Sequence, residues 1–212
     1  MRYRPWVGRA RWSPPCYIPA MHSDPATVLR SIARATARDR ALIAALPGEG
    51  ERMAEAADKV RALLEAVRVF ESLGVPYALI GGVAVGLHAG VPRATLDTDF
   101  AVHTRHRGAR LLEAFAAGGF TLRGEHAHSV NLRHSGGEPV QLAFDESFNP
   151  MLDRSEVFDF EGTVLRIVAK GDLIEMKRRA AADPGRRRSE ALRDRADIEL
   201  LRGDVPEPDE GW

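Results

Sequence analysis

Cysteine is almost absent from this chain of 212 residues. Cys16 stands alone, which excludes a disulfide framework and a cysteine-based zinc site, and such cysteine usage fits a reducing cytoplasm. Long apolar runs are absent too: none approaches the ~20 residues that a helix needs to span a bilayer. The first twenty residues also lack the continuous apolar stretch of a secretory signal. We therefore expect a cytoplasmic protein with no membrane partner.

Net charge is also missing, because 30 Lys and Arg balance 30 Asp and Glu. The balance favours neither a nucleic-acid scaffold nor an anionic membrane as the overall partner. The charge is nevertheless uneven, since residues 176–195 carry eight basic side chains against three acidic ones. With 44% hydrophobic and 28% charged residues, the chain has the composition of one soluble domain, alone or with a helical appendage.

The first twenty residues hold four arginines, two tryptophans and four prolines but no acid. Three interpretations stay open for them: a disordered arm, an organellar presequence, or upstream sequence read from a wrong start before Met21. We favour the arm or the misplaced start, and we assign no function to it. The expected division of the chain is an arm (1–24), an N-terminal helical segment (25–74), a core (75–169), C-terminal helices (170–204) and an acidic tail (205–212).

Hydrophobic periodicity predicts helices and strands that do not alternate strictly. Asp24-Pro25 is typical of a helix start, with Asp24 as the N-cap. Further helices are expected over 51–73, 83–89, 107–117, 171–181 and 189–201, and strands over 77–80, 96–102, 129–133, 139–144, 157–160 and 163–168. This mixture indicates an α+β fold, with a mixed β-sheet, flanking helices and helical segments at both ends.

The stretch 77–102 carries the strongest chemical signal, and reads YALIGGVAVGLHAGVPRATLDTDFAV. A short buried strand runs into Gly81-Gly82, where the backbone turns tightly and a ligand can come close. Backbone N–H groups at the start of the following helix favour an anion. On the second strand Asp97 and Asp99 share one face, because strand side chains alternate, and their Cα atoms are expected ~6–7 Å apart.

Two carboxylates at that separation can hold two hard cations ~3.5–4 Å apart. Magnesium prefers few carboxylates, several waters and phosphate oxygens as ligands. Arg93, four residues before Asp97, is placed to reach a phosphate oxygen with its planar guanidinium. The stretch therefore predicts a site for a phosphate ester and its metal ions. The plainer alternatives are a solvated strand end for the aspartates and a structural ion pair for Arg93.

The pattern Gly81-Gly82, then Asp97-x-Asp99 after an intervening helix, resembles the signature of the DNA polymerase beta-like nucleotidyltransferases. The fuller run 81–102 is similar to the abortive-infection (AbiEii-like) type, which is often one half of a toxin–antitoxin pair. DLIEMK at 172–177 and RDRADI at 193–198 resemble the closing helices of that family. The likeness thus covers residues 75–202.

The resemblance implies transfer of a nucleoside monophosphate from an NTP to a hydroxyl, with release of pyrophosphate. Asp97 and Asp99 would bridge two magnesium ions, one activating the attacking hydroxyl and the other neutralising the triphosphate. The remaining implied contacts are with phosphate: Gly81 and Gly82 would cradle the β- and γ-phosphates, and Lys177 or Arg93 would steady the leaving pyrophosphate.

One position departs from the family pattern. The superfamily usually supplies a third carboxylate from a later strand, and here Gln141 stands where that aspartate is expected. Its neutral oxygen is a weaker magnesium ligand. Asp145 lies four residues on and shares the face of Gln141 if the strand continues, so it could substitute or simply end the strand. Glu138 would point to the other face.

Three hypotheses follow for the activity. The first is a magnesium-dependent nucleotidyltransferase that modifies a macromolecule, either RNA or a partner protein, and the basic segment 177–195 slightly favours it. The second is a small-molecule enzyme, such as one that adenylylates an antibiotic. The third is a catalytically weakened binding module, which Gln141 keeps open.

Overall fold

The structure is a computed structural model and describes residues 24–44 and 58–203. Its centre is a seven-stranded mixed sheet in the order β3-β4-β5-β2-β1-β7-β6. The pairs β1–β7 and β2–β5 are parallel and the other pairs are antiparallel. The strands are β1 Tyr77–Ile80, β2 Thr98–Val102, β3 Phe120–His126, β4 Ser129–His134, β5 Pro139–Ala143, β6 Glu156–Phe160 and β7 Thr163–Ile167.

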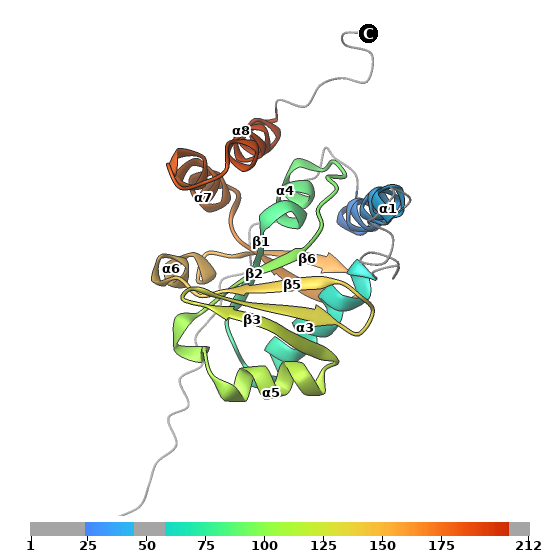
Figure 1. The fold of residues 1–212 in the computed structure, drawn as a ribbon, viewed down its shortest axis with the longest axis vertical. Coiled ribbons are helices and arrows are strands. Elements are labelled where there is room, and N and C mark those ends of the chain that lie inside the picture. The colour runs from blue at the N-terminus through green and yellow to red at the C-terminus, as the bar shows by residue number, and fades with distance from the viewer. Residues whose placement is uncertain (1–23, 45–57, 204–212) are drawn as a thin grey trace, which may run out of the picture.

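Helices lie on both sides of this sheet. Figure 1 shows α3 and α5 against one face, and α4, α7 and α8 on the opposite side. The described helices are α1 Pro25–Ala44, α3 Lys59–Leu73, α4 Gly81–Ala89, α5 Ala109–Ala117, α6 Asn149–Leu152, α7 Lys170–Ala182 and α8 Arg188–Arg202. Within the described part of the chain, none of them combines the length and the apolar character needed to cross a membrane.

The ends of the two N-terminal helices follow from local chemistry. At α1, the Asp24 carboxylate accepts a hydrogen bond from the Thr27 backbone N–H (3.2 Å), which confirms the predicted cap. At α3, the Asp58 side chain accepts from the Arg61 N–H (2.9 Å), and Gly74 ends the helix in the left-handed conformation. Strand β1 begins three residues after this glycine, at Tyr77.

The predicted mixed sheet with flanking helices is confirmed, although some boundaries move. Helix α3 is described only from Lys59, and the predicted part 51–57 lies outside the described residues. Strand β2 begins at Thr98 and not at 96, so Asp97 precedes the strand. Strand β3 and the short helix α6 were not predicted, because most of β3 is exposed at the sheet edge and lacks an apolar face.

The core beneath the sheet is centred on aromatic rings. Phe70 of α3 stacks on Tyr77 of β1, with ring centroids 4.6 Å apart. It also meets Phe100 of β2 (5.3 Å) and Phe115 of α5 (5.1 Å) edge to face. All four side chains are buried. Phe70 therefore ties two helices to the two strands that lead into the glycine turn and the aspartates.

We expect Phe70→Ala to destabilise the protein by about 3–5 kcal/mol, because it leaves a cavity among three other rings. Leu192→Ala is the control, since Leu192 is 53% exposed and its truncation should change stability by no more than ~0.5 kcal/mol. Urea unfolding of both variants measures the difference. A loss below ~1 kcal/mol for Phe70→Ala would contradict this account of the core.

Candidate active site

The site is built where β1 runs into α4. Gly81 and Gly82 are the first two residues of that helix, and no side chain caps it. Gly81 has φ +68°, a left-handed conformation that favours glycine. A Cβ atom at Gly81 would lie only 2.0 Å from Oδ2 of Asp99. The glycine thus lets a carboxylate lie against the positive end of the helix.

Sheet register brings Asp99 to this position. Strands β1 and β2 pair with Ile80 opposite Asp99, so the aspartate sits beside the residue that precedes the glycines. Burial, followed by repulsion from Asp97, raises the pKa of Asp99 to about 7. Lys177 and Lys59 oppose that rise. The two aspartates are therefore close enough for their charges to interact, although Asp97 lies before the strand and not on it as predicted.

The loop before β2 carries the second aspartate. Thr95 donates a hydrogen bond from its hydroxyl to Oδ1 of Asp97 (3.1 Å). Arg93 precedes them and packs on the next glycine, because a Cβ at Gly82 would lie 2.3 Å from its Nη1. Both glycines thus have a steric reason to be glycine: Gly81 faces Asp99 and Gly82 faces Arg93.

Arg93 is held by the last described helix. Its guanidinium makes a two-pronged contact with Asp197 of α8, from Nε to Oδ1 (2.5 Å) and from Nη2 to Oδ2 (3.1 Å). Lys177 of α7 lies 2.8 Å from Asp197 and 2.9 Å from Asp194. The structure therefore brings together the two cations that the sequence assigned to phosphate, on shared carboxylates. Their contact with phosphate stays a prediction.

Positive charge exceeds negative charge in this group. Arg186 forms a fourth ion pair, 2.6 Å from Asp194, that is not aligned as a hydrogen bond. Three cations thus meet two buried carboxylates. Sequence reasoning quoted Asp194 and Asp197 only as part of a family pattern. Their three-residue spacing on one helix face was the signal that they act together.

Gln141 lies where the sequence placed it. Strands β2 and β5 pair in parallel with Asp99 opposite Gln141, so the two side chains share a face of the sheet. The Gln141 amide donates to Oδ1 of Asn131 on β4 (3.1 Å). Glu138 points to the opposite face, as predicted, because its carboxylate accepts from the Thr98 hydroxyl (2.9 Å).

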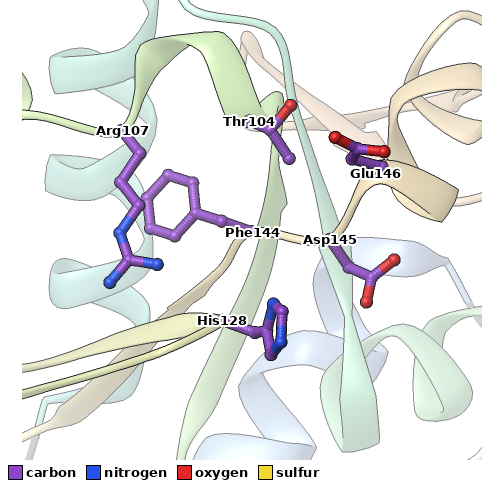
Figure 2. A pocket seen from close by; sticks show the side chains of 6 residues that line it. All are labelled: Thr104, Arg107, His128, Phe144, Asp145 and Glu146. Carbon is purple, nitrogen blue, oxygen red and sulfur yellow. The ribbon is translucent and has the colours of Figure 1, made fainter.

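Asp145 does not take the position that would let it supply the missing carboxylate. Strand β5 ends at Ala143, so the condition that the strand continues is not met. The Asp145 carboxylate accepts from the Ser147 N–H (2.8 Å), and hydrogen bonding by the side chain and then the backbone of Ser147 lowers the pKa of Asp145. Figure 2 shows Asp145 in a separate pocket with His128, Phe144 and Glu146. Gln141, not Asp145, is thus the neighbour of Asp99.

The donor set fits a hard divalent cation that keeps other ligands. Asp97 and Asp99 supply carboxylate oxygens beside a helix start. Among the described residues, no group of three or more His, Cys, Asp and Glu side chains is placed to hold a metal ion. Magnesium is usually bound by one or two carboxylates, with water and substrate phosphate completing the shell. The residues present are therefore compatible with it.

No family model and no curated protein sequence matches the chain, but solved structures share its fold. An antigenic nucleotidyltransferase-like protein from Paracoccidioides brasiliensis is 23% identical, with TM-score 0.51, over 73% of this chain and 81% of its own. A lincosamide antibiotic adenylyltransferase bound to lincomycin is 15% identical, with TM-score 0.51, over 70% of this chain and 99% of its own. ANT(2")-Ia in complex with adenylyl-2"-tobramycin is 14% identical, with TM-score 0.50, over 70% and 91%. The chain has the nucleotidyltransferase fold.

We expect Gly81→Ala to destabilise the protein more than Gly74→Ala. Both glycines have left-handed backbones (φ +68° and +62°), but only Gly81 faces a side chain, whereas nothing lies within 4 Å of a Cβ at Gly74. The backbone term, about 1–2 kcal/mol, is common to both, and overlap with Asp99 should add about 1–3 kcal/mol. Urea unfolding measures the loss of stability in both variants. Equal losses would show that the close approach of Asp99 does not restrict the residue at position 81.

Proposed function

We propose that this chain is a magnesium-dependent nucleotidyltransferase that transfers a nucleoside monophosphate from an NTP to a hydroxyl. The observation that carries the proposal is the placement of Asp99 against Gly81, with Asp97 one residue outside the same strand. The fold shared with nucleotidyltransferase structures supports it. The sequence likeness to the AbiEii-like type suggests a toxin–antitoxin setting.

The positions of the side chains support the following roles. Asp97 and Asp99 would hold two magnesium ions, whose charge would favour activation of a hydroxyl and neutralise the triphosphate. The N–H groups at Gly81 and Gly82 face the β- and γ-phosphates at the positive end of α4. Arg93 and Lys177 steady the leaving pyrophosphate, and Asp197 orients both of them.

A macromolecular acceptor is favoured by the surface of α8 and the loop before it. Four arginines there are exposed and form no ion pair with any described residue: Arg187, Arg188, Arg193 and Arg195. Such unpaired guanidinium groups suit the phosphates of RNA, or an acidic protein surface. We therefore place RNA or a partner protein first as the acceptor.

A small-molecule acceptor is the second candidate. Two structures of similar fold are described with lincomycin and with adenylyl-2"-tobramycin. Incubating the protein with α-labelled NTP and magnesium, and with RNA, lincomycin or tobramycin in parallel, distinguishes the candidates by which acceptor becomes labelled. Labelling of an antibiotic and not of RNA would favour the second candidate.

We expect Asp97→Asn and Asp99→Asn each to weaken magnesium-dependent NTP binding by at least about 10-fold, because each removes a charged ligand. Asparagine has nearly the same shape, so both variants should stay folded. Asp153→Asn is the control, since Asp153 is exposed on another part of the molecule. Calorimetric titration with each NTP and magnesium measures the change. Unchanged affinity in both site variants would exclude the metal role.

Gln141→Asp tests whether the chain is an enzyme or a weakened binding module. A carboxylate opposite Asp99 should tighten magnesium binding and raise the rate of nucleotide transfer by about 10-fold or more. Asp145→Asn is the comparison, because asparagine also caps and should leave the rate unchanged. The rate is measured as label transferred from α-labelled NTP. An inactive wild type revived by Gln141→Asp would favour the binding module, and loss of activity in Asp145→Asn would refute this placement of the ligand.

A further inference from the structure

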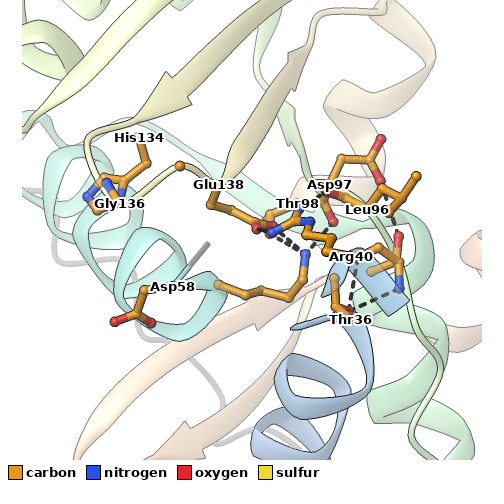
Figure 3. Close-up of polar contacts among 12 residues, drawn as sticks. Thr36, Arg40, Asp58, Leu96, Asp97, Thr98, His134, Gly136 and Glu138 are labelled. Carbon is orange, nitrogen blue, oxygen red and sulfur yellow. Dashed lines mark hydrogen bonds and ion pairs between the residues drawn. The ribbon is translucent and has the colours of Figure 1, made fainter. Parts of the chain in front are cut away.

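Four buried polar side chains meet at the start of β2, and Figure 3 labels three of them, Thr36, Arg40 and Glu138. Thr36 and Arg40 come from α1, Lys59 is the first residue of α3, and Glu138 precedes β5. Their exposed fractions are 1%, 7%, 1% and 0%. We call these four residues the buried polar cradle.

The cradle forms hydrogen bonds with the backbone of three consecutive residues. The Thr36 hydroxyl accepts from the Thr95 N–H (3.3 Å), and its one hydrogen is shared between the carbonyls of Ile32 (2.8 Å) and Thr95 (3.1 Å). The Arg40 guanidinium donates to the carbonyl of Leu96. The Lys59 ammonium donates to the carbonyl of Asp97 (2.9 Å). Two helices that lie far away in sequence therefore hold the loop that carries Asp97.

Glu138 joins the cations of the cradle to the sheet. One carboxylate oxygen accepts from Lys59 and from the Thr98 hydroxyl, and the other accepts from Arg40 (2.9 Å). The turn that carries Glu138 is itself fixed on α3, because the Asp58 N–H donates to the Gly136 carbonyl (3.1 Å). The cradle is thus a continuous network from α1 to β5.

Fold stability alone gives no reason for such a network. Buried ion pairs are often no more stabilising than apolar residues of the same volume, because each charge loses its hydration. Here two cations share one carboxylate, and each cation also donates to the loop before β2. The contacts of the cradle therefore converge on that loop and on Thr98 at the start of β2.

Asp97 needs such support more than Asp99 does. Asp99 lies inside β2 and is held by the pairing with Ile80, whereas Asp97 precedes the strand and has no partner in the ladder. A carboxylate on a loop binds a metal tightly only when outer contacts fix its position.

We propose that the buried polar cradle is a positioning device that sets the carboxylates of Asp97 and Asp99 for metal binding. This inference rests on the proposed function, since it takes the two aspartates as metal ligands. It makes α1 part of the active site, although no side chain of the cradle touches the metal. Thr36, Arg40, Lys59 and Glu138 are thus positioning residues.

The test compares metal affinity with stability. Thr36→Val removes the hydroxyl and keeps the shape, whereas Thr36→Ser keeps the hydroxyl. Lys59→Met removes the charge that holds the Asp97 carbonyl. Binding of Mn²⁺ alone is measured from the electron paramagnetic resonance signal of free Mn²⁺, and stability from thermal unfolding. We expect Thr36→Val and Lys59→Met to weaken Mn²⁺ affinity about 10-fold, and Thr36→Ser to stay within about twofold of wild type.

Leu165→Ala is the control, because Leu165 is buried on β7, which β1 separates from β2 in the sheet. It should lower stability and leave Mn²⁺ affinity unchanged. The proposal is overturned if Thr36→Val and Lys59→Met bind Mn²⁺ as wild type does while Asp97→Asn and Asp99→Asn do not. If the two aspartate variants also bind as wild type, the metal role fails and this inference fails with it. Should Lys59→Met not fold, the valine and serine variants decide the question alone.

Discussion

Repulsion between two neighbouring carboxylates is the constraint on which the rest of this site depends. Asp97 is exposed and Asp99 is partly buried beside it, and burial and repulsion from Asp97 hold the pKa of Asp99 near 7. Positive charge from several parts of the fold offsets this repulsion. The start of α4 contributes its dipole, Lys177 acts from α7, and Lys59 acts from beneath the sheet. A bound cation would also offset the negative charge of the two carboxylates.

These charges arrive from opposite sides of the sheet by different means. On the α4 side, buried Asp194 and Asp197 hold Arg93, Lys177 and Arg186 in ion pairs, so the cations have fixed positions before any phosphate binds. On the α3 side, the cradle donates hydrogen bonds to backbone carbonyls, and the charge of Lys59 also opposes the rise in the pKa of Asp99. The first arrangement organises charge for a substrate, and the second organises the loop that presents the ligands.

The central part of this architecture could be predicted from the sequence. Gly81-Gly82 after a buried strand and Asp97-x-Asp99 on the next strand are local patterns, and the structure places Asp99 against Gly81. The family resemblance put Gln141 on a later strand as a possible ligand. In the structure β5 pairs Gln141 with Asp99, and its role at a metal stays a prediction. The start of β2 was predicted two residues too early, since hydrophobic runs do not mark where a ladder begins.

Other features could not be predicted because they depend on partners distant in sequence. Lys59 and Arg40 lie in helical stretches where a cation is normally solvated, and only the approach of Glu138 makes their burial possible. Strand β3 carries mostly exposed side chains at the sheet edge and shifts register between Leu122 and Gly124, so it shows no regular alternation. Tertiary contact decides each of these cases.

The pairing of Arg93 with Asp197 also has a consequence for how the chain matures during synthesis. The two residues are 104 positions apart, and the arginine belongs to the loop that leaves the glycine helix. A chain growing from its N-terminus therefore builds the sheet around the aspartates well before the helix that anchors this arginine has been made. Contacts of such long range form late. A ribosome-bound or prematurely ended chain would thus present the aspartates without the anchored cations, and only release of the finished C-terminal helix would close the site.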